Sequence, residues 1–222
     1  MGGNMANTDT VVRVDIISDV MCPWCIVGFR QLEQALGHTG MGAQVVWHPF
    51  ELNPDMPPEG QNLSEHIQQK YGSSPEQSAA ARPHLSALGQ GLGIYSAYSA
   101  DIRIRITFQA HQLLDFALSQ GKQHPLKLAL FAAHFEDGRD VSDPSVLIDV
   151  ATSVGLDRDN AAQVLETGAL EKSVRDKQAF WAERGVSGVP TMIFDAKYMM
   201  TGAQGIENYT QVLNRIAQDQ AA

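Results

Sequence analysis

The stretch D-V-M-C-P-W-C-I-V-G-F-R, residues 19–30, decides the fold of this 222-residue chain. It contains Cys22 and Cys25, the only two cysteines of the sequence, at the spacing of a Cys-X-X-Cys motif. The β-branched run over 11–17 before it predicts a strand, and apolar residues recur at helical spacing over 26–36 after it. The cysteines are therefore expected where a strand ends and a helix begins.

Cysteines at the first turn of a helix have distinctive chemistry. Backbone N–H groups and the helix dipole face the first sulfur and stabilise its thiolate. In such motifs the thiol pKa falls from about 8.5 to roughly 3.5–7.5. We therefore predict that Cys22 is the acidic, reactive thiol and that Cys25, one turn inside the helix, is the shielded resolving thiol.

The two residues between the cysteines fit this interpretation. Pro23 suits the first helical position because its φ is already helical and its missing N–H is not needed there. Trp24 is the candidate for substrate contact, since an aromatic ring between the two cysteines cannot be fully buried without hiding the sulfur.

Two structural explanations of the motif compete with a redox role. A zinc site needs a second ligand pair at short spacing, but the chain has no second cysteine pair, and its seven histidines include no H-x(3–5)-H pair. No metal is therefore predicted. A purely structural disulfide would staple a single helical turn and constrain little of the chain.

Composition narrows the partners and the compartment. The net charge of −9 argues against nucleic acid or an anionic membrane as the main partner, and no run approaches the roughly 18 apolar residues of a membrane span. Residues 1–10 are expected to be disordered and have neither the basic nor the apolar region of a secretory signal. A cytoplasmic location is therefore expected, where disulfides are usually transient and catalytic.

Along the chain, the pattern predicts two sheet-forming segments separated by helices. The first helix is expected to end at Gly37, and a strand over 43–47 completes a βαβ unit with the dithiol at the carboxyl end of its first strand. A proline-rich loop over 49–60 follows. Helix formers then predict helices over 63–71, 75–88, 107–119, 125–136, 144–154 and 159–167. A helix ending at Gly185, strands over 191–194 and 197–201, and a final helix close the chain.

The strand leading to C-P-W-C and the distant Val-Pro before two strands resemble the thioredoxin superfamily, and the helical insertion resembles its DsbA-like branch. The blocks D-V-M-C-P-W-C-I-V-G, W-H-P-F-E-L-N-P-D-M-P-P-E-G, A-H-Q-L-L-D-F-A, G-V-S-G-V-P-T-M-I-F and K-Y-M-M-T-G-A-Q are similar to FrnE-type DsbA-like oxidoreductases. The resemblance implies an α/β thioredoxin-like domain, βαβ plus ββα, over 11–60 and 169–222. A large all-helical insertion domain over 61–168 interrupts it.

The resemblance also implies roles for individual residues. Cys22 would attack, Cys25 would resolve, and Pro190 would be a cis proline facing the dithiol. The backbone of Val189 would pair with the substrate as an added strand does. Pro23 and Trp24 would complete the substrate-binding surface.

The chain departs from the family pattern at three places. It has Ile26 where many members have Tyr, and Ile106-Thr107 where Asn-Thr is usual; both changes bear on substrate preference. Asp195-Ala196 replaces the expected Asn-Gly of the late hairpin and makes a poor turn, because Ala disfavours φ > 0.

The leading functional prediction is a thiol–disulfide oxidoreductase that acts on protein or small-molecule thiols and disulfides. No cofactor is predicted beyond glutathione as a candidate redox co-substrate, and the chain is expected to be a monomer or homodimer. One alternative is a glutathione-dependent isomerase or transferase resembling the kappa class, whose members carry Ser at the position of Cys22. The other is a redox-independent, chaperone-like binding module that uses the helical segment.

Four further polar residues are candidates for a place near the thiols. His111 and His134 lie in apolar helical stretches and are predicted to be packed core histidines. His48 follows a predicted strand and can approach the site, but nothing requires it to do so. Asp19 either influences the thiols or caps the helix, or else it is a solvated loop carboxylate.

Overall fold

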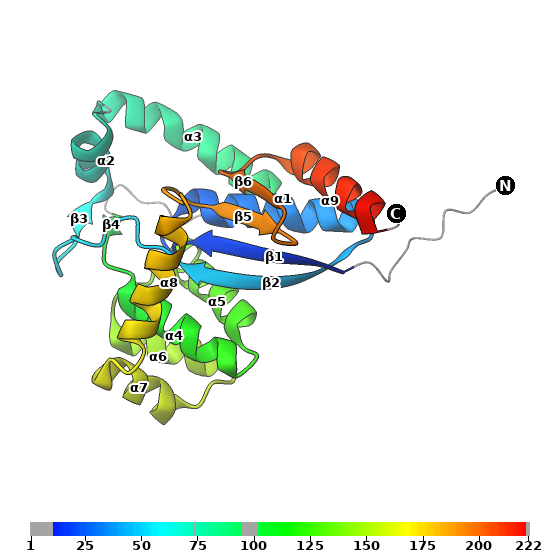
Figure 1. Ribbon diagram of the computed structural model, residues 1–222. Helices are drawn as coiled ribbons and strands as arrows, with labels where there is room; N and C mark the ends of the chain where they lie inside the picture. The colour runs from blue at the N-terminus through cyan, green and yellow to red at the C-terminus, as the bar shows by residue number, and fades with distance from the viewer. Residues whose placement is uncertain (1–10, 73, 95–101, 221–222) are drawn as a thin grey trace.

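A four-stranded sheet forms the centre of the protein (Figure 1). The computed structural model describes residues 11–72, 74–94 and 102–220, so the expected disorder of residues 1–10 lies outside the described residues. The strand order is β2-β1-β5-β6, with β1 parallel to β2, antiparallel pairing of β1 with β5, and a β5–β6 hairpin. The strands are β1 (Val11–Ser18), β2 (Gly42–Pro49), β5 (Thr191–Phe194) and β6 (Tyr198–Thr201).

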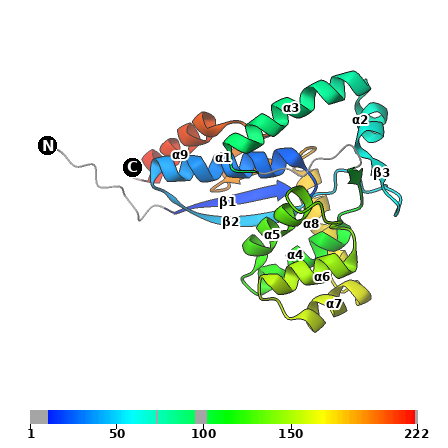
Figure 2. The same ribbon diagram turned by 180° about the vertical axis from the view of Figure 1, so that it is seen from behind.

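Helices cover both faces of this sheet. On one face lie α1 (Pro23–Thr39) and α9 (Ile206–Gln220), and on the other lies α8 (Glu171–Glu183) (Figures 1 and 2). The apolar residues of β1 divide between the two faces. Val12, Val14 and Ile16 join the core with α1 and α9, whereas Ile17 packs with Trp181 of α8.

The predicted helical insertion contains six helices among the described residues. They are α2 (Leu63–Tyr71), α3 (Pro75–Gly91), α4 (Phe108–Ser119), α5 (Gln123–Phe135), α6 (Pro144–Ser153) and α7 (Arg158–Thr167). The last four gather beside the sheet, while α3 lies along the α1 and α9 layer (Figure 2). A short unpredicted pair of strands, β3 (Gln61–Asn62) and β4 (Arg103–Ile104), joins the two ends of the α2–α3 segment.

Two hydrophobic clusters organise the molecule. One fills the space between the sheet, α1 and α9, and the other lies among α4 to α7. Val20 and Met21, just before the dithiol, belong to the helical cluster, whereas Cys22 and Cys25 belong to the sheet cluster. The motif therefore lies where the two clusters meet. Among the described residues, no helix is both long and apolar enough to cross a membrane.

The end of α1 and the late hairpin turn differ from simple sequence preferences. The first helix does not end at Gly37 but continues to Thr39, and Gly40 adopts the left-handed conformation, φ 67°, that ends it. Either glycine can end a helix, and spacing alone does not select between them. The Asp195-Ala196 turn forms in spite of its composition, with both residues at positive φ.

Candidate active site

The end of β1 and the start of α1 position the two thiols. Ser18 ends the strand, and Pro23 is the first residue of α1, as predicted. Cys22 is the N-cap with extended φ and ψ of −84° and 114°, and its carbonyl accepts a hydrogen bond from Cys25 N at 3.0 Å. Both cysteines are free thiols, and they are 3% and 0% exposed. The structure thus holds two buried sulfurs one helical turn apart.

The loop before β5 faces the first sulfur. The Val189–Pro190 peptide bond is cis, as the family resemblance implied. The Cys22 thiol donates to the Val189 carbonyl oxygen with a sulfur–oxygen distance of 3.8 Å. Pro190 packs closely on α1, where a Cβ at Gly28 would lie 3.2 Å from its Cγ. The structure therefore brings together residues that are 167 positions apart in the chain.

The ionisation of the two thiols differs from the prediction. The hydrogen bond with Cys25, burial and the Cys25 charge raise the pKa of Cys22 well above its usual value, and the Asp19 charge acts in the same direction. Burial opposes ionisation of Cys25, but hydrogen bonds from Cys22 and Ser18 and the charge of Lys127 lower its pKa. The predicted acidity of Cys22 is therefore wrong for the reduced pair. At Cys22, the interaction with Cys25, burial and nearby negative charge outweigh the helix N-terminus, and Cys25 is the thiol of the pair with the lowered pKa.

Asp19 is neither a solvated carboxylate nor a helix cap. It is 2% exposed, and its carboxylate accepts hydrogen bonds from Met21 N at 3.4 Å and Leu52 N at 2.8 Å. His111 Nε2 lies 3.8 Å from Asp19 Oδ1. Burial favours the neutral acid, but the interaction with His111, the hydrogen bond from Leu52 N and the charge of Lys127 lower the pKa of Asp19 below its usual value. Asp19 thus contributes a negative charge beside the dithiol, the first of the two roles considered for it.

Lys127 is the site residue that sequence reasoning missed. It lies on α5, far from the motif in sequence, and it is 0% exposed. Its charge acts on both cysteines and on Asp19, and burial lowers its pKa to about 8. The available signal was a lone lysine in the apolar run L-K-L-A-L-F, because charged residues are rarely fully buried without a reason.

The histidines have structural partners. His111 is 2% exposed, and its Nε2 forms a hydrogen bond with the Phe50 carbonyl oxygen at 2.9 Å. This confirms that it is a packed core histidine. His134 is also buried and packs against the Phe135 ring with a centroid distance of 4.6 Å. His48, on β2, does not contact a cysteine. Its Nε2 forms a hydrogen bond with Asp15 Oδ1 on β1 at 2.8 Å.

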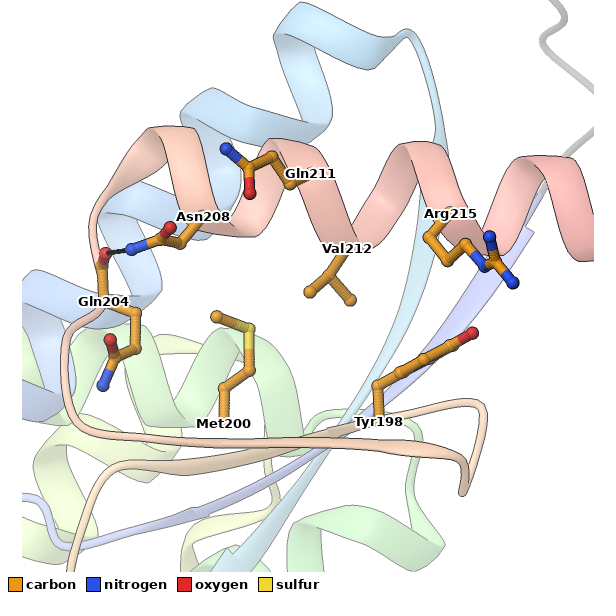
Figure 3. A pocket seen from close by; sticks show the side chains of 7 residues that line it. All are labelled: Tyr198, Met200, Gln204, Asn208, Gln211, Val212 and Arg215. Atoms are coloured by element: carbon orange, nitrogen blue, oxygen red, sulfur yellow. Dashed lines mark hydrogen bonds between the residues drawn. The ribbon is translucent and has the colours of Figure 1, made fainter.

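A second hollow of the described chain lies away from the dithiol. A hollow of about 400 Å³ opens between β6 and α9, with Tyr198, Met200 and Arg215 in its lining, but neither cysteine borders it (Figure 3). Trp24, on the first turn of α1, keeps 44% of its surface exposed. No group of three or more His, Cys, Asp or Glu side chains suited to a metal occurs within 11–72, 74–94 and 102–220.

The chain belongs to the DSBA-like thioredoxin domain family, whose model matches residues 13–214. A crystal structure of a probable DsbA oxidoreductase from Streptomyces coelicolor has 35% sequence identity and a TM-score of 0.84, covering 92% of this chain and 89% of that one. An uncharacterised protein, YwbO, from Bacillus subtilis is 25% identical over 205 residues, or 91% of this chain and 96% of the relative.

A more distant structure shares the fold. It is the cytosolic disulfide reductase DsbM from Pseudomonas aeruginosa with GSH, which is 16% identical with a TM-score of 0.60 over 93% of this chain and 99% of that one. The family match and the probable DsbA oxidoreductase together support an oxidoreductase or isomerase.

Proposed function

We propose that this protein is a thiol–disulfide oxidoreductase in which Cys22 exchanges disulfides with substrates and Cys25 resolves the mixed disulfide. The observation that carries the proposal is the position of the Cys22 sulfur. It lies at the start of α1, within hydrogen-bond distance of the Val189 carbonyl oxygen. Cys22 is the better nucleophile candidate because it retains a little exposed surface and Cys25 retains none.

The proposed reaction consists of two thiolate attacks that balance in electrons. The Cys22 thiol, which can turn its single hydrogen from the Val189 carbonyl to the neighbouring sulfur, gives its proton to the Cys25 thiolate. The Cys22 thiolate then attacks a substrate disulfide and releases one substrate sulfur as a thiolate. Cys25 gives this proton to the released substrate thiolate, attacks the Cys22 sulfur as a thiolate, and releases the second substrate sulfur as a thiolate. The dithiol loses two electrons and the substrate disulfide gains them. The reverse sequence oxidises a substrate dithiol.

The proposed substrate surface surrounds this sulfur. The exposed ring of Trp24 and the backbone of Val189 are its main contacts, with Pro23 and Pro190 completing it, and Val189 would pair with an extended peptide. Glutathione is the proposed redox co-substrate, in line with the GSH in the DsbM structure. The proposed compartment is the cytoplasm, in line with DsbM, which is a cytosolic disulfide reductase.

The proposal is tested by equilibrating the protein across a glutathione redox series and trapping its thiols. Wild type is expected to form one intramolecular disulfide reversibly. Cys25→Ser is expected to accumulate a mixed disulfide at position 22, because nothing resolves it, while Cys22→Ser accumulates far less. Equal trapping by the two variants would contradict the assignment of nucleophile and resolving thiol.

The same variants separate the proposal from its two alternatives. A glutathione-dependent isomerase or transferase would keep its turnover of a small molecule after Cys22→Ser, since the glutathione thiol does the chemistry. A chaperone-like module would still protect an aggregating client after both cysteines are replaced by serine. If wild type formed no disulfide and either of these results were obtained, the oxidoreductase proposal would be wrong and the corresponding alternative would take its place.

A further inference from the structure

Lys127 is a fully buried cation without a hydrogen-bond partner among residues 11–72, 74–94 and 102–220. A lysine ammonium has three donors, and a buried charge is normally paired. The sheet cluster and the helical cluster meet here, because Leu126 and Leu130 pack among the insertion helices while Phe131 joins the sheet core. Burial of the Lys127 ammonium therefore costs desolvation free energy, and no hydrogen bond offsets that cost.

The immediate surroundings offer only weak compensation. Lys127 Nζ lies 5.2 Å from the centroid of the Trp47 ring and 4.9 Å from that of Phe131, which are cation–π distances. A void of about 10 Å³ lies beside the lysine, which is at the lower limit for one water molecule. Neither the rings nor so small a void replaces the hydration shell of an ammonium.

The two rings near the ammonium, Trp47 and Phe131, pack in the same cluster as Cys22 and Cys25, so the lysine borders the dithiol. Cys25, Asp19 and Cys22 are the three groups whose negative charge opposes the effect of burial on Lys127, with Cys25 the largest. The ammonium in turn acts on the Cys25 thiol and on the Asp19 carboxylate. Other titratable groups line the same void from β2 and α4, namely His48, His111 and Asp115. Asp115 already pairs with Lys177 of α8, and His111 bonds the Phe50 carbonyl.

We propose that Lys127 is a positioning residue for thiol–disulfide exchange: from the helical insertion, its ammonium holds the Cys25 sulfur as the thiolate that resolves the mixed disulfide. The inference rests on the oxidoreductase function proposed above. When Cys25 attacks, the Cys25–Cys22 bond forms, the Cys22–substrate bond breaks, and the negative charge leaves with the substrate sulfur. Lys127 keeps its proton throughout, and Asp19 remains as its counter-charge in the disulfide state.

The test replaces Lys127 with methionine, which keeps the length and apolar stem and removes the charge. The first readout is thiolate absorbance of the reduced pair against pH, whose midpoint is expected to rise by about one pH unit or more. The second is release of the leaving thiol from a preformed Cys22 mixed disulfide, which is expected to be at least about tenfold slower at pH 7. Unchanged values for both would overturn the proposal.

Two further variants keep the result interpretable. Gln112→Leu removes Gln112 Oε1, the other buried side-chain atom without a hydrogen-bond partner in the described ranges, and it is expected to leave both readouts at wild-type values. Lys127→Gln serves as a second neutral variant and must repeat the methionine result, or the charge explanation fails. The absorbance titration needs no substrate, so it reports on Lys127 even if wild type fails to exchange disulfides and the oxidoreductase proposal falls.

Discussion

Trp24 combines a position between two buried cysteines with an exposed fraction of 44%. Replacing it with alanine is expected to lower kcat/KM for a peptide disulfide about tenfold, since removal of an aromatic side chain from a binding surface commonly costs about 1 kcal/mol or more. The reduced-to-disulfide equilibrium with glutathione and the urea midpoint should stay near wild type, because the ring is not part of the core.

A matched control for this prediction lies on α4. Leu118 is 42% exposed, so Leu118→Ala removes a similarly exposed apolar side chain and is expected to leave turnover unchanged. If Trp24→Ala kept wild-type kcat/KM, the ring would have no role in substrate contact.

Single residues also define the limit of sequence reasoning here. Cys22, Cys25, Val189 and Pro190 were predictable because a short motif and a family pattern identify them, and the structure brings them together. The ionisation of the two thiols was not predictable from the motif, because it depends on charged side chains that other elements bring to the site. Asp19 is near in sequence, but its partners Leu52 and His111 come from a loop and from α4, and Lys127 comes from α5. The spacing of residues along the sequence does not predict these tertiary contacts.

At the scale of elements, the β5–β6 hairpin holds two residues in an unfavourable conformation. Asp195 and Ala196 have φ of 47° and 55°, and Lys197 N bonds the Phe194 carbonyl at 2.9 Å across the turn. The Asp195 carboxylate accepts hydrogen bonds from Arg13 N and Gln220 Nε2, which compensate for the unfavourable backbone conformation. Ala196 has no side-chain group that can compensate.

Ala196→Gly is therefore expected to raise the free energy of unfolding by about 1 kcal/mol, since glycine adopts positive φ without the Cβ penalty. Urea denaturation measures the change. Ala179→Gly on the exposed side of α8 is the matched control, and it should lower stability by about 0.5–1 kcal/mol because its φ is helical. Destabilisation by both substitutions would show that the turn is not strained.

Element types were easier to predict than their ends and pairings. Periodicity identified the long helices and the strands of the sheet, because burial of one face requires regular spacing. The extension of α1 to Thr39 and the two-residue strands β3 and β4 escaped prediction. A helix end with two nearby glycines and a pairing of two residues leave almost no periodic signal.

At the scale of the whole molecule, the site lies where the sheet cluster and the insertion cluster join. The sheet side contributes both thiols and the cis-proline loop, and the insertion contributes Lys127 and His111. The insertion is thus part of the electrostatic environment of the dithiol. The family pattern predicted that an insertion exists, but not that it would place a charge at the sulfurs.

Acid should destabilise the folded protein through its buried histidines. Burial lowers the pKa of His134 to about 4, although the charges of Asp19 and Asp140 oppose this, and burial also lowers the pKa of His48 and His124. Below about pH 6.5 the unfolded chain binds protons that the folded chain cannot, so stability is full above that pH and falls as pH decreases toward about 4. His134 alone accounts for roughly 3 kcal/mol of that loss.

His134→Gln, which keeps a side-chain N–H donor, is therefore expected to flatten the fall in unfolding free energy between about pH 6.5 and 4, as measured by urea titrations at several pH values. Replacing His38, which is exposed at the end of α1, with glutamine should leave the slope of wild type unchanged, because that change removes no buried group. The slope is the decisive quantity, since His134→Gln can lower stability at every pH by disturbing its packing against Phe135. A slope equal to that of wild type would mean that folding does not lower the pKa of His134, and the acid sensitivity would then have to arise elsewhere.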